Sequence, residues 1–121
     1  ITEDDGGTIT TNFELTNSNG NLTVRGNINS TSDARTKENV ITVDNALDKV
    51  TKLRGVYFDK IDNPGTRYLG VIAQEVQEVI PEVVLDNGPD TMLSVSYGNL
   101  AGLFIEALKE LKKEVDEIKG L

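Results

Sequence analysis

The chain has 121 residues, enough for one small domain with or without an appendage, and only 37% of them are hydrophobic and 5% aromatic. So small an apolar content favours an oligomer, in which neighbouring subunits complete the core. The net charge of −8 argues against binding to nucleic-acid phosphates, and the short apolar runs argue against a membrane span. Because the chain has no Cys and no His, Ser-His-Asp triads, Cys-His dyads and typical zinc sites are excluded.

Residues 1–31 are rich in Thr, Asn and Gly and carry no signal-peptide pattern, so we expect the sequence to begin inside a longer polypeptide. Alternation of apolar residues predicts strands over 8–15 and 22–28, joined by a turn at 17–21 that contains Asn-Gly. Such sequence is typical of elongated fibre shafts in which several chains wrap together. The alternative is a flexible leader.

From Thr36 onwards the sequence predicts short helices and strands in alternation. Asp44 is a candidate N-cap for a helix over 45–54, and Gly55 a candidate stop signal. We expect a hairpin from strands over 56–59 and 66–70, with a turn at 62–65, and then a helix over 71–80 that ends at Pro81. Two short strands are predicted over 82–86 and 92–97, with a turn between them. The fold class is α+β.

A final helix is predicted from about Gly98 or Asn99 to Lys119. Its apolar residues alternate spacings of four and three: Phe104, Leu108, Leu111, Val115 and Ile118. We call these five residues the seam. Charged residues fill most of the other positions, so only a narrow stripe is available for burial. The pattern favours a self-associating coiled coil over a lone amphipathic helix on the core of its own domain.

Without His or Cys, hydrolytic chemistry is left to a Ser-Lys pair or a carboxylate pair, or is absent. Ser32 and Lys37 are the candidate Ser-Lys pair, although most pairs at this spacing are solvated loop residues. Five residues along a helix leave two side chains roughly 140° apart, and five along a strand place them on opposite faces. The pair can therefore meet only across a turn, for example one capped by Asp33 and running through Arg35. A lysine acts as a base only if its pKa falls from about 10.4 to about 7 or 8. Burial or a nearby guanidinium such as that of Arg35 favours this, whereas a free carboxylate opposes it.

The segment Ser32-Asp33-Ala34-Arg35-Thr36-Lys37-Glu38-Asn39-Val40 resembles the signature that opens the intramolecular chaperone auto-processing domain. Domains of this family end phage tail spikes, tail fibres, neck appendages and endosialidases. The resemblance continues through Lys52–Phe58, Leu69–Val76, Pro81–Val84, Val95–Tyr97 and the terminal helix. Thr36 stands where the family often has Leu, and Val40 where it often has Ile, but neither departure affects Ser32 or Lys37.

The resemblance implies a self-cleaving serine endopeptidase that needs no cofactor and no metal. Cleavage would fall between Thr31 and Ser32, with Ser32 as nucleophile and Lys37 as base. The reaction would run through an N-to-O acyl shift or through direct attack by water. Arg35, Gln74 and backbone amides are candidates for stabilising the oxyanion.

The resemblance also implies two regions with different fates. Residues 1–31 would end a fibre or appendage shaft, and residues 32–121 would form the chaperone that trimerises it in the host cytoplasm and is then released. The shaft of the same polypeptide would be both client and substrate, with the hairpin around residues 59–65 as a candidate grip. The alternatives are a structural trimerisation tip that never cleaves and a binding module, for example for sugar.

Overall fold

The structure is a computed structural model that describes residues 20–120. The chain divides into two compact units, Ile1–Val40 and Ile41–Leu121. The strand predicted over 8–15 and most of the turn predicted at 17–21 lie outside the described residues. Residues 20–31 form no strand, and their apolar side chains Leu22, Val24 and Ile28 are exposed. The strand predicted over 22–28 is thus not formed in a single chain, because a strand this short needs partners to bury its apolar face.

The second unit begins with the short helix α1 (Ala46–Thr51), which is smaller than the helix predicted over 45–54. Asn45 precedes it with φ 49° and ψ 39°, a left-handed conformation that asparagine tolerates better than most residues. The prediction that Asp44 is the N-cap is wrong: Asn45 occupies that position. The Asp44 carboxylate instead forms an ion pair, with 3.2 Å between its Oδ1 and Lys49 Nζ. Local sequence therefore predicted the helix correctly but not the way its N-terminus is satisfied.

Strands β1 (Val56–Lys60) and β2 (Asn63–Gly70) form the predicted antiparallel hairpin. The chain reverses at residues 61–62 rather than at 62–65, and the register shifts between Asp59 and Lys60. The carboxylate of Asp59 accepts the Gly65 N–H at 3.2 Å, which holds the irregular part of the hairpin. Phe58 stacks on Tyr68 across the two strands, with ring centroids 5.7 Å apart.

Helix α2 (Ala73–Val79) ends before Pro81, as the sequence predicts. A 3-10 turn, Pro81–Val83, replaces the first part of the predicted strand, so that only β3 (Val84–Leu85) is extended. It pairs antiparallel with β4 (Ser94–Val95), which is likewise shorter than predicted. These elements return the chain to the start of α3 (Leu100–Lys119), the long terminal helix.

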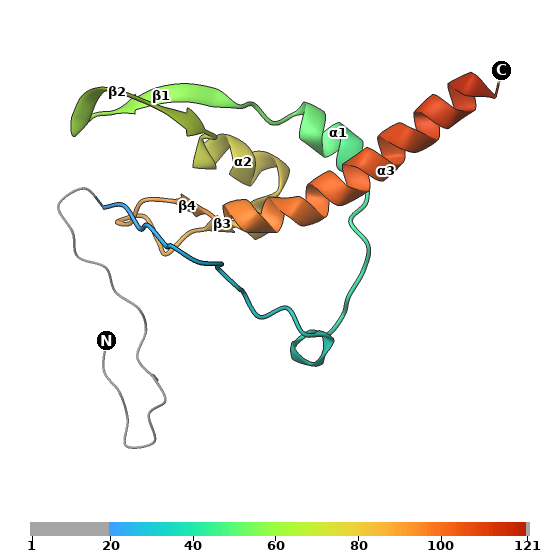
Figure 1. The fold of residues 1–121 in the computed structure, drawn as a ribbon, viewed down its shortest axis with the longest axis horizontal. Coiled ribbons are helices and arrows are strands. Elements are labelled where there is room, and N and C mark those ends of the chain that lie inside the picture. The colour runs from blue at the N-terminus through green and yellow to red at the C-terminus, as the bar shows by residue number, and fades with distance from the viewer. Residues whose placement is uncertain (1–19, 121) are drawn as a thin grey trace. The chain divides into compact units, whose positions relative to one another are not determined.

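A small core holds the helices of the second unit together, and α1 lies against α3 (Figure 1). Its buried members come from α1, α2, the 3-10 turn and the first half of α3: Ala46, Val76, Ile80, Val83, Leu100, Leu103 and Ala107. Val76 and Leu103 are each 1% exposed, and the burial of each contributes about 1.5–3 kcal/mol. All described residues after Glu110 on α3 are exposed, so the second half of the helix contributes nothing to this core.

Gly70 is expected to tolerate no side chain. A Cβ on this residue would lie 2.6 Å from the Tyr97 hydroxyl oxygen, which accepts the Val71 N–H at 3.2 Å. We therefore expect Gly70→Ala to lower the free energy of unfolding by about 1–3 kcal/mol in denaturant titrations. Gly55→Ala is the matched control, because no atom lies within 4 Å of its added Cβ. If Gly70→Ala costs as much in a Tyr97→Phe background as in the wild type, the clash is not the cause.

The ion pair between Arg54 and Glu75 links the end of the α1 region to α2. The guanidinium donates through Nε at 3.1 Å and Nη2 at 2.7 Å. These hydrogen bonds hold the pKa of Glu75 below its usual value, so the stabilisation is present above about pH 4.5 and is lost as the pH falls further. We expect the denaturant midpoint to fall less steeply below about pH 4.5 in Glu75→Gln than in the wild type. Glu78→Gln should behave like the wild type, and equal slopes in all three proteins would refute this role.

Candidate functional site

A turn separates Ser32 from Lys37, as the geometry of the pair requires. It is a 3-10 turn over Ala34–Thr36, and Asp33 caps it by accepting the Arg35 N–H through Oδ1 at 2.8 Å. The backbone oxygen of Asp33 also accepts the Thr36 N–H at 3.0 Å and the Thr36 hydroxyl at 2.7 Å. The Lys37 N–H closes the turn by donating to the Ala34 oxygen at 3.1 Å. The predicted capping role of Asp33 is confirmed.

Asp33 and Arg35 also neutralise each other within this turn. The guanidinium donates to both carboxylate oxygens, from Nε at 3.0 Å and from Nη2 at 2.9 Å. These bonds lower the pKa of Asp33 and raise that of Arg35. Asp33, one of the two nearby carboxylates that would oppose a lysine base, is therefore engaged, whereas no hydrogen bond or ion pair engages Glu38 among the described residues. The positive charge of Arg35, which would favour a lysine base, is balanced by Asp33.

Asn39 completes the local structure of the segment. Its φ is 53°, in the left-handed region that asparagine enters more readily than most residues. Asp33, Arg35 and Asn39 thus each have a clear structural role in shaping the chain around the turn. The side chains of Ser32 and Lys37 have none among the described residues, where no hydrogen bond joins either of them to any partner.

Thr31, Ser32 and Lys37 are all exposed in the single chain. Gln74, the other candidate supporting residue, belongs to the second unit and is exposed on α2. Among residues 20–120 the structure contains no group of three or more side chains suited to hold a metal ion. Within the same range no helix is long and apolar enough to span a membrane.

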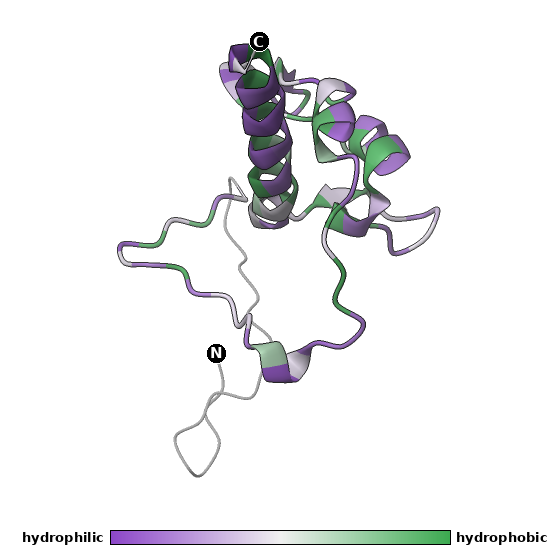
Figure 2. Ribbon diagram, turned by 90° about the vertical axis from the view of Figure 1, so that its right-hand side faces the viewer, coloured by the Kyte–Doolittle hydropathy of each residue, from purple (hydrophilic) through white to green (hydrophobic). Residues whose placement is uncertain are grey.

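The seam lies on α3 beside the stripe that packs on the core. All five of its residues are exposed, from 39% at Val115 to 68% at Ile118. At 100° per residue the seam is centred roughly 65° around the helix from the buried residues Leu100, Leu103 and Ala107. In Figure 2 the ribbon of α3 carries both hydrophobic (green) and hydrophilic (purple) residues along its length. One stripe of α3 therefore covers the core of its own unit, while the seam forms a second apolar stripe that stays exposed. The coiled coil predicted from the seam stays a prediction.

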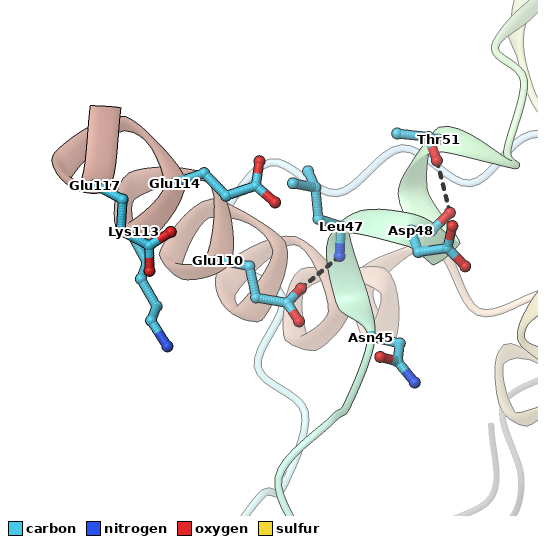
Figure 3. Close-up of a pocket in the computed structure, with 8 residues that line it drawn as sticks. All are labelled: Asn45, Leu47, Asp48, Thr51, Glu110, Lys113, Glu114 and Glu117. Atoms are coloured by element: carbon cyan, nitrogen blue, oxygen red, sulfur yellow. Dashed lines mark hydrogen bonds between the residues drawn. The ribbon is translucent and has the colours of Figure 1, made fainter. Parts of the chain in front are cut away.

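A groove between α1 and α3 contains a long-range contact that the sequence did not indicate (Figure 3). Its lining includes four acidic side chains and one lysine: Asp48, Glu110, Glu114, Glu117 and Lys113. Glu110 differs from the other acids, because its carboxylate accepts the backbone N–H groups of Ala46 and Leu47. No local pattern could reveal this, because the partners are 64 and 63 residues apart.

Fold and site together define a small α+β module with a long terminal helix, an exposed apolar seam and an exposed Ser-Lys turn. Residues 32–85 match the peptidase family described as the chaperone of endosialidase. This match begins at Ser32 and includes the turn, α1, the hairpin and α2. Over this segment, which is a little under half of the chain, the sequence is similar to the chaperone-of-endosialidase family.

Similar curated proteins are long tail fibre proteins of phages. The chain is 38% identical to the long tail fiber protein Gp37 of Enterobacteria phage K3 over 114 residues, which cover 84% of this chain and 9% of that protein. The protein of the same name from Enterobacteria phage T2 is also 38% identical, with 84% and 8% covered. That of Enterobacteria phage M1 is 33% identical, with 73% and 38% covered. The chain thus spans less than a tenth of the length of the first two relatives.

Proposed function

We propose that the chain is the C-terminal chaperone region of a phage tail fibre protein, which trimerises the fibre and then removes itself by cleavage between Thr31 and Ser32. The family match and the similarity to tail fibre proteins support the chaperone role. In this proposal residues 1–31 end the fibre, and residues 32–121 form the chaperone. The precursor assembles in the host cytoplasm, and the fibre becomes part of the virion tail.

The proposed chemistry uses Ser32 as nucleophile and Lys37 as base. Ser32 Oγ attacks the carbonyl carbon of Thr31 and passes its proton to Lys37 Nζ. The C–N bond breaks as that proton moves on to the α-amine of Ser32, leaving an ester between Thr31 and Ser32. Water then hydrolyses the ester to a Thr31 carboxylate and the free Ser32 hydroxyl. In the alternative route the dyad activates a water molecule, which attacks the same carbonyl and gives the same products.

The observation that carries this proposal is the division of roles within the turn. Asp33, Arg35 and Asn39 build the local structure, whereas Ser32 and Lys37 flank the turn with side chains that have no structural partner among the described residues. A serine and a lysine that do no structural work, on either side of a turn that can bring them together, are the parts that a dyad requires.

Assembly would supply what the single chain lacks. A lysine becomes a base only when its surroundings disfavour the ammonium, and Lys37 is exposed in the single chain. An interface that closes around the turn when three chains associate through the seam would exclude water from the pair. Cleavage would then follow trimerisation, so that the chaperone leaves only a fibre that has already formed.

The chaperone role is tested on the parent fibre polypeptide, made either with residues 32–121 or truncated after Thr31. The full polypeptide should give soluble, protease-resistant fibre trimers, and the truncated one mostly aggregate. Association of the terminal helices places three shaft ends at high effective concentration, which the truncated chains lack. The exposed hairpin tip at Ile61 could hold the shaft during this step. Equal yields of resistant trimer from both polypeptides would exclude the chaperone role.

A trimerisation tip that stays attached is the second candidate function. It is favoured by one observation, the exposure of Lys37, because nothing in the single chain excludes water from this side chain. The two functions differ in a single result. A tip that stays attached remains one polypeptide after assembly, whereas the self-cleaving chaperone becomes two.

A further inference from the structure

The seam is an apolar stripe of α3 that stays open in the single chain. The spacing of its residues assigns them to the two core positions of a heptad, a (Leu108, Val115) and d (Phe104, Leu111, Ile118). Every residue from 111 to 119 is exposed in the single chain. A stripe with this pattern is complementary to the core positions of another helix that carries the same pattern.

The two sides of the seam carry different charges. On one side lie the e positions, each directly after a d residue: Ile105, Lys112 and Lys119. On the other side lie the g positions, each directly before an a residue: Ala107, which is buried in the core of its own unit, and Glu114. Along the last turns of α3 the seam therefore has lysine on one side and glutamate on the other.

Glu114 and Lys119 are the charges beside the seam that have no partner within the described residues. Lys112 is already engaged along its own helix, because its Nζ lies 2.6 Å from Asp116 Oδ2. Glu114 and Lys119 are both exposed, and neither makes a hydrogen bond or an ion pair among residues 20–120. The groove that Glu114 lines contains three further acidic side chains and only one lysine (Figure 3). This side of the seam would therefore attract a positive charge from another chain.

The orientation of a neighbouring helix decides whether these two charges meet. In a parallel coiled coil the g residue of one heptad lies beside the e residue of the next heptad on the neighbouring helix. Glu114 and Lys119 stand in this relation. An antiparallel neighbour instead places e beside e and g beside g, so that Lys112 and Lys119 would face lysine or isoleucine. The charges beside the seam thus favour parallel helices.

The length of the seam favours helices that are also in register. Two parallel helices in register match all five core layers, from Phe104 to Ile118. A shift by one heptad keeps a beside a and d beside d, but it leaves only three of the five layers matched. The loss of buried apolar area therefore disfavours the shifted arrangement.

We propose that the seam binds further copies of this chain in parallel and in register, and that an ion pair between Glu114 of one chain and Lys119 of the next selects this arrangement. This inference rests on the proposed trimerisation, to which it adds the orientation of the chains and the residues that determine it. In a cyclic trimer each interface joins the Glu114 side of one chain to the Lys119 side of the next, so the pair forms three times.

The orientation is tested by disulfide formation, because the natural chain has no cysteine. Phe104→Cys and Ile118→Cys place one thiol at either end of the seam, about 21 Å apart along the helix axis. The two full-length variants are mixed in denaturant, refolded together and oxidised with glutathione. Intact mass spectrometry then distinguishes the three possible disulfide-linked pairs. We expect pairs that join 104 to 104 and 118 to 118, whereas a majority of pairs that join 104 to 118 would overturn the parallel arrangement.

The role of the ion pair is tested by exchanging its charges. Glu114→Lys and Lys119→Glu each place like charges side by side at all three interfaces. An exposed ion pair contributes up to about fivefold to an equilibrium constant, so each variant should raise the concentration at which trimers form by about tenfold or more. Sedimentation over a range of concentrations measures this shift. The double variant should return to the wild-type concentration because the opposite charges are restored.

Glu117→Lys is the matched control, because it makes the same change in charge one turn from Glu114 on a side of α3 that faces away from the seam. It should trimerise at the wild-type concentration. High salt should reduce the difference between Glu114→Lys and the wild type, since salt screens exposed charges.

The outcomes separate this inference from the function on which it rests. If the wild type forms trimers but the losses in the two single variants add in the double variant, the ion pair is refuted and the trimer stands. A Glu114→Lys chain that trimerises like the wild type refutes the pair as well. A wild-type chain that stays monomeric at every concentration overturns the proposed trimerisation, and this inference with it.

Discussion

Ser32→Ala is expected to leave the chain uncut while it still associates. The substitution removes the hydroxyl oxygen that would attack the Thr31 carbonyl, so the rate of cleavage should fall by about a thousandfold or more. The exposed Ser32 side chain makes no hydrogen bond among the described residues, so the fold should not change. Denaturing gel electrophoresis over time measures the cleavage, and sedimentation measures the association.

Ser30→Ala is the matched control, because it removes a hydroxyl two residues away on the other side of the proposed cleavage site. It should cleave at the wild-type rate. Lys37→Ala should be as inactive as Ser32→Ala, since a nucleophile and its base act as one unit and their losses do not add. Cleavage that persists unchanged in either Ser32→Ala or Lys37→Ala rules out the dyad.

Replacing Leu108 and Leu111 together with aspartate is expected to prevent formation of the proposed trimer and leave monomers. Both side chains are exposed in the single chain, at 66% and 44%, so its own core should be unaffected. Each buried leucine contributes about 1.5–3 kcal/mol, and three chains lose two leucines each. Burying unpaired carboxylates in their place adds a further cost. Sedimentation at micromolar concentration should therefore show a single species of monomer mass.

Lys113→Asp is the control for this experiment, because residue 113 lies on the side of α3 opposite the seam. It alters the charge of the helix without touching the apolar stripe, so the trimer should persist. The double aspartate variant should also lose cleavage if the active site closes only on assembly. A double variant that remains trimeric would show that the seam is not the interface.

Periodicity in the sequence predicted most of the fold because the second unit consists mainly of amphipathic helices and an antiparallel hairpin. The helix 71–80, the hairpin and the terminal helix are confirmed with shifts of a few residues at their ends. Ends are hard to predict when distant residues determine them. The start of α1 shows this: Asp44 is a good capping residue by type, but Glu110 satisfies the amides from across the groove.

The strand predicted over 22–28 shows a different limit. Its alternating pattern describes a surface that needs a partner, and residues 20–31 of a single chain supply none. The seam likewise needs a partner that a single chain does not supply. Its spacing predicted an apolar stripe, and the structure confirms that the stripe is exposed, whereas the number of chains that cover it stays a prediction.

The candidate site could be predicted in part, because the segment 32–40 contains residues that shape the turn as well as the two proposed catalytic residues. From sequence alone Asp33 is a capping candidate, and the structure confirms that role. The sequence did not predict the ion pair between Arg35 and Asp33. An arginine at this position is equally suited to disfavour a lysine ammonium or to stabilise an oxyanion, so its partner could not be chosen from sequence. Gln74 remains a candidate by resemblance alone.

Intact mass spectrometry of the purified wild-type chain, after sedimentation has confirmed its assembly, tests the central claim most directly. We expect two fragments that divide between Thr31 and Ser32, one ending in a threonine carboxylate and the other beginning with a serine amine. A single uncut mass from fully assembled chains would contradict it.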